Sequence, residues 1–459
     1  MEQETQNRIG KDFTTLGLFR FALPAFAMNI FTQIFRSLDD ALFISRYVGE
    51  KALAALNLLS PLNSIQLALG NLFCLGSSNI SARLMGQGKQ AQAKQVFTKI
   101  VISTLVVGCF FALLINIFAN PILSILGADE LLASYSIYQI RFVYSIAPIS
   151  LVNNVFSAYY STAGKPKLGM ICSIVNGVSN IGLDLLLVAG MNKGVIGACT
   201  ATVIGEVLVF LIGLFFFCNK NNEIHFVKPE GEYINTCLES FRYALPQCVN
   251  SLSFAVTNFY TNSILLDMIG ADGVAANAII SDIRAIIISG LFGIAASIGP
   301  IIAYNYGNRN PVKLKRILKS VLTIWSIGSI VLITIGFILR TPLIGIYMSE
   351  NSTQEFLDMA FFGLTIEIFS VPFSSGCVLS TRMFIALGNS KASTFISIVR
   401  NLVVRMICLF LLPKLFGIPG IWLAIPLGEA ISFMICIAII YINRDNYGYG
   451  KSGLAFKMQ

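Results

Sequence analysis

The chain has 459 residues, of which 55% are hydrophobic and only 12% are charged, with 32 Lys and Arg against 23 Asp and Glu. A soluble domain of this length carries about twice that share of charge, so a soluble globular protein is excluded. The mean hydropathy is +0.75. Apolar segments of about 20 residues recur along the chain, and each is long enough to cross a bilayer as a helix. The predicted fold class is an all-α polytopic membrane protein.

Twelve spans are predicted in chain order. They cover residues 14–44, 52–82, 96–118, 136–162, 168–189, 195–217, 237–266, 273–303, 317–339, 354–385, 392–413 and 418–442. Several of them exceed the thickness of the hydrocarbon layer, so they must tilt, bend or protrude. Pro148 and Pro372 lie inside two of these spans and are candidate kinks.

The distribution of basic residues predicts the orientation of the chain in the membrane. With both termini in the cytoplasm, the inner segments hold 20 Lys and Arg and the outer loops hold 5. We therefore expect a multi-pass membrane protein with both termini in the cytoplasm. The basic loops explain the net charge of +9 through contact with anionic lipid, so no nucleic acid partner is expected.

The chain contains an internal duplication with a spacing of 221 to 224 residues. Phe21-Ala-Leu-Pro24 recurs as Tyr243-Ala-Leu-Pro246, and Gly86, Gly164, Gly197 and Glu206 recur as Gly307, Gly388, Gly420 and Glu429. We predict a six-helix lobe over 1–218, a linker over 219–236, a second six-helix lobe over 237–445 and a tail over 446–459. Six helices per half make the repeats parallel, and transporters built from such repeats bind substrate between them.

Ionisable side chains at membrane depth cost about 2.5–3.5 kcal/mol on insertion scales, so each needs a reason. The first predicted span (14–44, helix 1) carries a polar face that ends in Asp40. The fifth predicted span (168–189, helix 5) carries one that ends in Asp184. Carboxylate and amide oxygens suit Na⁺, and buried, mutually repelling carboxylates suit H⁺. These faces consist of Asn29, Gln33, Arg36 and Asp40 on helix 1, and of Asn176, Asn180 and Asp184 on helix 5.

The charged residues within the predicted spans also allow structural roles. Arg36 can simply pair with Asp39 or Asp40 one turn away. Glu206 and Glu429 occupy equivalent repeat positions, which favours a shared packing role. In the second half Glu367 has no cation within one turn, and Asp282 either faces the cleft or pairs elsewhere. The candidate substrate contacts in the cleft are Asn29, Gln33, Arg36, Asn176, Asn258, Asp282 and Glu367.

Several motifs resemble one transporter family, the MATE (multidrug and toxic compound extrusion) transporters. They are Leu38-Asp-Asp-Ala-Leu-Phe-Ile-Ser, Met85-Gly-Gln-Gly-Lys, Ala163-Gly-Lys-Pro-Lys and Asn180-Ile-Gly-Leu-Asp184. Their order and spacing carry the resemblance through nearly the whole chain. Within the family, the chain resembles the bacterial multidrug exporters.

The resemblance implies a V-shaped fold of two six-helix bundles and export of amphipathic or cationic compounds in exchange for H⁺ or Na⁺. The family's cation site corresponds here to Asp40, Asn180 and Asp184, and more loosely to Thr202. No cofactor is expected besides the coupling ion, and any metal would be a transient Na⁺ at Asp40, Asn180 and Asp184. Some members of the family carry a carboxylate in the seventh span, which is 237–266 here and has no acid beyond its first turn. The resemblance therefore does not imply a second ion site in the second half. A monomer is expected.

Four other classes of membrane protein are alternatives to a MATE-like exporter. The major facilitator fold also has two parallel repeats, but the loop after helix 2 lacks the acid of its Gly-x-x-x-Asp-Arg pattern. A lipid-linked sugar flippase of the same superfamily would need a strongly cationic cleft, for which Arg36, Arg141, Arg400 and Arg405 are available. A membrane enzyme lacks its cluster of metal ligands or its nucleophile and base. A receptor would not need buried carboxylates in a duplicated cleft.

Overall fold

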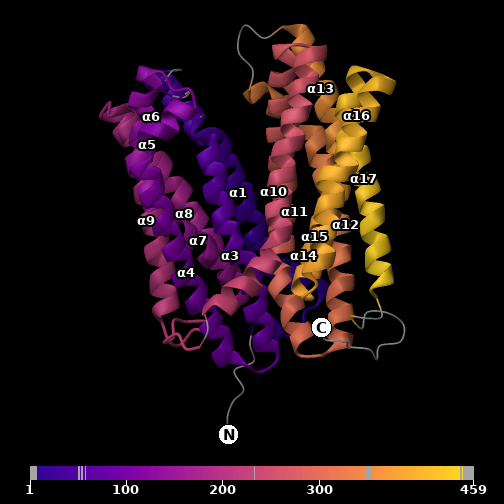
Figure 1. Cartoon of the computed structure of the whole chain (residues 1–459). Coiled ribbons are helices and arrows are strands. Elements are labelled where there is room, and N and C mark those ends of the chain that lie inside the picture. Colours follow the sequence, from indigo (N-terminus) through magenta and orange to yellow (C-terminus); the bar gives the residue numbers. More distant parts are fainter. Residues whose placement is uncertain are drawn as a thin grey trace. The chain divides into compact units, whose positions relative to one another are not determined.

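The computed structural model describes residues 8–49, 52, 55–56, 58–231, 233–347, 353–444 and 447. Side chains are described for these residues except 36–46 and the single positions 8, 75, 233, 234, 237, 244, 248, 255 and 271. Throughout this part of the chain the regular structure is helical, with no strand (Figure 1). The predicted all-α class is confirmed.

The first half of the chain contains η1 (Arg8–Gly10), α1 (Thr15–Tyr47), α3 (Ser60–Gly86), α4 (Gln90–Ile117), α5 (Ala119–Ile125), α6 (Glu130–Phe142), η2 (Tyr144–Ile146), α7 (Ala147–Thr162), α8 (Pro166–Asp184), η3 (Leu185–Gly190) and α9 (Gly194–Cys218). The second half contains α10 (Tyr233–Met268), α11 (Ala271–Gly307), α12 (Pro311–Ile346), α13 (Gln354–Ile368), α14 (Val371–Ala386), α15 (Ser390–Ile398), η4 (Val399–Val404), α16 (Arg405–Phe416) and α17 (Ile418–Ile442).

Each of the twelve predicted spans coincides with one helix or with consecutive helices. The span with Pro148 is divided into α6, η2 and α7, and the span with Pro372 into α13 and α14, which are bent by 46°. Within the described residues, eight helices are long and apolar enough to cross a membrane, or nine if α13 and α14 form one span. The predicted spans on α3, α6–α7 and α10 are not among them.

The exposed surface of α4 is apolar, as expected for a helix surrounded by lipid. On α4, Val106, Phe110, Leu113 and Ile117 expose between 58% and 62% of their surface. Their spacing of four, three and four residues places them on one face of the helix. A contiguous stripe of this kind would be a liability in water, but it is the normal outer face of a membrane helix.

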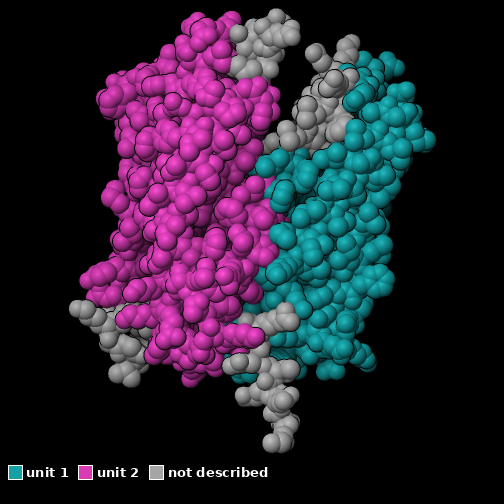
Figure 2. Space-filling model, turned by 180° about the vertical axis from the view of Figure 1, so that it is seen from behind, with its two compact units in different colours: residues 1–9, 31–244 teal, residues 10–30, 245–459 magenta. Residues whose placement is uncertain are grey.

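The chain divides into two compact units, which Figure 2 shows in different colours. The first comprises residues 1–9 and 31–244, and the second comprises residues 10–30 and 245–459. Each unit therefore includes one end of a helix from the other half of the sequence, because α1 and α10 are both divided. The predicted lobe boundaries at 218 and 237 stay a prediction.

Close backbone approaches hold these divided helices within their units. In the second unit, a Cβ built on Gly293 of α11 would lie 2.2 Å from the carbonyl oxygen of Ala25 in α1. In the first unit, a Cβ on Gly76 of α3 would lie 2.6 Å from the carbonyl oxygen of Ser240 in α10. Small residues at such positions let membrane helices pack backbone against backbone.

One buried contact is repeated in both units. In the first unit, Asn153 of α7 donates through Nδ2 to Oε2 of Glu206 at 2.6 Å and to the backbone oxygen of Glu206 at 3.0 Å. Ser150 and Asn176 also lie near this carboxyl group. All these partners are neutral, so Glu206 is held by dipoles.

The equivalent positions of the second unit make the same contact with different chemistry. Arg400 corresponds to Asn176 at a spacing of 224, and it donates through Nε and Nη2 to the two carboxyl oxygens of Glu429 at 2.7 and 3.0 Å. Cys377 corresponds to Asn153, and its Sγ lies 3.9 Å from the backbone oxygen of Glu429. The expected shared packing position is therefore present, but one carboxylate has an ionic partner and the other has amide partners.

This difference predicts unequal effects of the same substitution. Glu429→Gln removes the charge that compensates Arg400 and should lower the free energy of unfolding by about 3–5 kcal/mol, because a buried guanidinium is left unpaired. Glu206→Gln should cost about 1 kcal/mol, since the partners of Glu206 are neutral. Thermal unfolding of the purified variants in one detergent measures both. Equal shifts in Tm would contradict the assignment.

A close approach between α4 and α7 gives a second prediction. A Cβ on Gly108 would lie 2.5 Å from Cα of Pro148, so Gly108→Ala should separate the two helices and destabilise the protein by about 1–3 kcal/mol. Gly182→Ala on α8 is the matched control, because a Cβ there meets nothing within 4 Å. The same unfolding assay should show a lower Tm for the first variant only.

Candidate functional site

The first unit contains a polar seam between α8 and α9, which pack directly against each other. Asn180 and Asp184 of α8 are buried, with 7% and 4% of their surfaces exposed. Asn180 Nδ2 donates to Thr202 Oγ1 of α9 at 3.3 Å, and the Thr202 hydroxyl donates to the backbone oxygen of Ala198 at 3.1 Å. The structure thus joins two of the four residues to which the resemblance assigned the cation site, Asn180 and Thr202, and places Asp184 one turn along α8 from Asn180.

The seam continues one turn before Asn180, at Asn176 of α8 and Glu206 of α9. A Cβ on Gly205 would lie 2.5 Å from Oδ1 of Asn176, so the glycine before Glu206 allows the two helices to approach. Asp184 and Asn176 are eight residues apart, which corresponds to about 12 Å along the helix. Two carboxylates therefore lie along one seam, Asp184 buried and Glu206 half-buried, separated by amide and hydroxyl groups.

The helix changes its geometry immediately after Asp184. Residues Leu185–Gly190 form the π-helix η3, in which the turn is wider than in an α-helix. Single π turns inside α-helices are frequent at functional sites because the extra residue redirects the neighbouring side chains. Asp184 is the last α-helical residue before this change. The pattern of polar residues identified Asp184 but did not indicate the π turn.

The candidates on α1 are only partly described. The side chains of Arg36 and Asp40 lie outside the described ones, so their contribution to the site stays a prediction. Asn29 donates through Nδ2 to the backbone oxygen of Ala25 at 2.9 Å, a bond within α1 itself. Asn29 belongs to the second unit and Gln33 to the first, so the predicted polar face of helix 1 is divided between the units.

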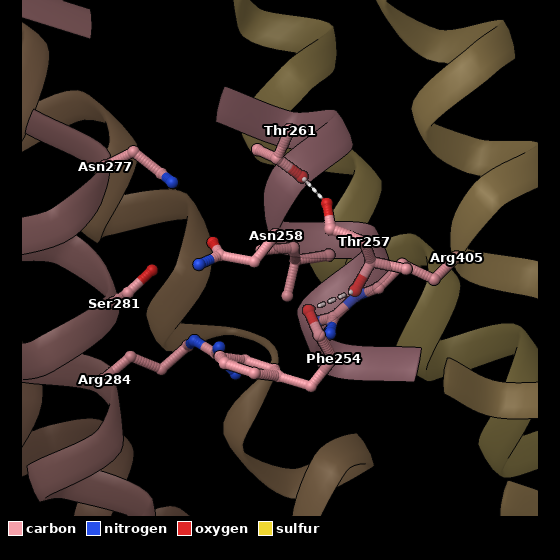
Figure 3. Close-up of a pocket in the computed structure, with 9 residues that line it drawn as sticks. Phe254, Thr257, Asn258, Thr261, Asn277, Ser281, Arg284 and Arg405 are labelled. Atoms are coloured by element: carbon pink, nitrogen blue, oxygen red, sulfur yellow. Dashed lines mark hydrogen bonds between the residues drawn. The ribbon is translucent and has the colours of Figure 1, made fainter. Parts of the chain in front are cut away.

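The second unit contains a pocket lined by residues of α10, α11, α16 and α17. The pocket is open on one side, and the empty space in it, including open solvent, is about 290 Å³. In Figure 3 the side chains of Asn258, Asn277 and Ser281 point toward one another, above the guanidinium of Arg284. The complete lining consists of Phe254, Thr257, Asn258, Thr261, Asn277, Ser281, Arg284, Arg405 and Ile425.

Ion pairs surround this pocket. Arg284 Nε lies 2.9 Å from Oε2 of Glu367, whose side chain is fully buried, although the angle is poor for a hydrogen bond. The cation that Glu367 lacked within its own helix therefore comes from α11. Arg405 Nη2 lies 4.0 Å from Glu429, which Arg400 already binds through two hydrogen bonds.

Of the predicted cleft residues in the second half, Asn258 lines the pocket and Glu367 lies behind it in the ion pair with Arg284. Asp282 is exposed and does not line the pocket. Sequence reasoning did not single out Asn277 and Ser281. Asn277, Ser281 and Arg284 follow one another at intervals of four and three residues, which puts all three on one face of α11. This spacing is the signal that could have identified them.

Comparison with known proteins agrees with this architecture. The MatE family model matches residues 24–186 and 243–411. A protein named multidrug export protein MepA from Staphylococcus saprophyticus is 24% identical over 459 residues, covering 99% of each chain. A protein of the same name from Staphylococcus aureus is 25% identical over 442 residues, covering 95% of this chain and 96% of that one.

Solved structures show the same fold. The crystal structure of a MATE protein in complex with MaL6 superposes with a TM-score of 0.88 at 21% identity, over 96% of this chain and 98% of that one. A MOP superfamily transporter from Pyrococcus furiosus gives a TM-score of 0.88 at 20% identity, over 97% and 99% of the two chains. Because the family model covers both halves of the sequence, this chain belongs to the MATE family of transporters.

Proposed function

We propose that this protein is a secondary active multidrug exporter that exchanges amphipathic or cationic compounds for H⁺ or Na⁺. The observation that carries the proposal is the similarity to proteins named multidrug export protein over 95–99% of this chain. That similarity extends through the segment that holds Asn180, Asp184 and Thr202. The coupling ion would be the only small inorganic group that the protein needs.

The polar seam of the first unit is the proposed ion site. Asp184 supplies a carboxylate, and Asn180 and Thr202 supply neutral oxygens that are held by their own hydrogen bond. Oxygen ligands of this kind suit a partly dehydrated Na⁺, and a buried carboxyl group suits a proton because burial disfavours its charged form. Asp40 of α1 completes the proposed site.

Transport would follow alternating access. Ion uptake at Asp184 from the outside lowers the affinity for the bound compound, which then leaves outward, and the ion-loaded protein returns to release its ion inside. The ion drives export only if the two states differ in their affinity for the compound. By reciprocity, the compound lowers the affinity for the ion by the same factor.

The proposal places the protein as a monomer in a bacterial plasma membrane, with both termini in the cytoplasm. The excess of basic residues in the predicted inner loops supports this orientation. The lipid bilayer and small molecules would be its only partners, and it would catalyse no chemical reaction.

A lipid-linked sugar flippase is less well supported. A pyrophosphate group carries at least two negative charges and would need a matching excess of cations. Arg400 is already bound by Glu429, and Arg141 belongs to the first unit, where it is exposed and donates to Asn116. Of the three of these arginines whose side chains the structure describes, Arg405 alone lines the pocket.

Efflux from proteoliposomes tests the exchange directly. Vesicles that contain the full chain and ethidium should lose the dye faster under an imposed pH or Na⁺ gradient than without one, and the gradient that works identifies the ion. Dye release that ignores both gradients would contradict secondary antiport.

Replacement of the seam carboxylate tests the ion site. Asp184→Asn should lower gradient-driven efflux at least about tenfold, because the amide binds neither H⁺ nor Na⁺ as the carboxylate does. Asp267→Asn is the matched control, since Asp267 is an exposed residue of α10. Full activity of Asp184→Asn would refute the site, whereas loss of activity in both variants would point to a general defect.

A further inference from the structure

The pocket of the second unit is rich in hydrogen-bond donors and contains no acid. None of its nine lining residues is acidic, and two are arginines. Thr257 and Thr261 donate their hydroxyl hydrogens to backbone oxygens of α10, so they offer only lone pairs. The donors that remain toward the cavity are the amide of Asn258, the second amide hydrogen of Asn277, whose first is donated to Asn262, the hydroxyl of Ser281 and the two guanidinium groups.

The ion pairs around the pocket do not balance. Arg284, Arg400 and Arg405 face Glu367 and Glu429, so three positive charges meet two negative ones. Glu367 pairs with Arg284, and Glu429 is bound through both oxygens by Arg400. Arg405 has only a 4.0 Å contact with Glu429, although just 8% of its surface is exposed. The excess positive charge therefore lies at Arg405, on the pocket wall.

The π-helix η4 explains how two arginines come to one carboxylate. In a regular α-helix, residues five positions apart point about 140° away from each other, because each residue turns by about 100°. The wider turn of a π-helix brings such positions closer to one face. Residues Val399–Val404 form this turn, so Arg400 and Arg405 both reach Glu429.

The remaining lining of the pocket is apolar. Phe254 exposes 50% of its surface and lies beside Arg284 in Figure 3, and Ile425 lies in the lining as well. A ligand that satisfies the whole lining therefore carries one negative charge for the guanidinium groups and an apolar or aromatic body for Phe254. A cation of similar size would meet two arginines and no carboxylate in the wall.

We infer that this pocket binds the carboxylate of an amphipathic organic monoanion, with Arg405 and Arg284 as its charge partners and Asn258 and Ser281 as hydrogen-bond donors. Planar guanidinium groups match the geometry of a carboxylate. The inference rests on the proposed function only in that the bound compound would be a transport substrate. It extends the expected substrates from cations to compounds with a single carboxylate.

Equilibrium binding of salicylate tests the inference without any transport. Radiolabelled salicylate is added to the full chain in nanodiscs of neutral phosphatidylcholine, in chloride-free buffer. Unlabelled salicylate should displace it, whereas the neutral isostere salicylamide and the cation benzyltrimethylammonium should not. Equal displacement by salicylamide would show that the charge is not recognised and would overturn the inference.

Two variants locate the site. Asn258→Asp puts a negative charge into the pocket at an exposed position and should weaken salicylate binding at least about tenfold through repulsion of the carboxylate. Arg405→Lys keeps the charge but loses the planar fork, so it should weaken salicylate binding, but by less than Asn258→Asp does. Asn308→Asp, the same substitution at the exposed C-terminal end of α11, is the control and should bind as the unmodified protein does.

The outcomes separate the two proposals. Unchanged salicylate binding in Asn258→Asp, or equal weakening in Asn308→Asp, would overturn the pocket assignment. Salicylate binding that follows the expected pattern in a protein without gradient-driven ethidium efflux would count against multidrug antiport and leave the anion site standing. Efflux without specific salicylate binding would do the reverse.

Discussion

The need to compensate a carboxylate held among the helices of each unit is the constraint on which much of this structure depends. Glu206 and Glu429 lie at equivalent positions of the two repeats, and each is contacted by the residues that correspond to one another in the neighbouring helices. A charge at membrane depth needs compensation, so the partners of each glutamate cannot be chosen independently of it. The duplication preserved the contact and allowed its chemistry to change.

That change makes the two units electrostatically different. In the first unit, neutral amides surround Glu206, and the seam leads along α8 to Asp184 without an arginine among its members. In the second unit, arginines occupy the corresponding surroundings and exceed the carboxylates by one. The first arrangement suits binding of a cation, and the second suits an anionic group. A transporter with both can respond to an ion in one half and to its substrate in the other.

The candidate site of the first half was predictable because its residues lie on one helix at a fixed spacing. Asn176, Asn180 and Asp184 repeat every four residues, so the face follows from helix geometry alone. Thr202 came only from the resemblance, and its hydrogen bond with Asn180 agrees with that assignment. The second half was harder because its partners come from different helices. Glu367 looked isolated in its own helix, and Arg284 of α11 compensates it across the interior.

The sequence by itself determined the class, the twelve helical segments and the duplication, because hydropathy, proline positions and repeated motifs act along the chain. At the repeat spacing Asp40 corresponds to Asn262 and Asp184 to Cys408, so the sequence also determined that these carboxylates are not repeated in the second half. Only the tertiary structure decided which charges meet, since ion pairs such as those of Arg284 and Arg400 join residues far apart in sequence. It also decided the division of α1 and α10 between the units and the π turns η3 and η4. Packing between helices sets these features, and no periodicity within one helix encodes them.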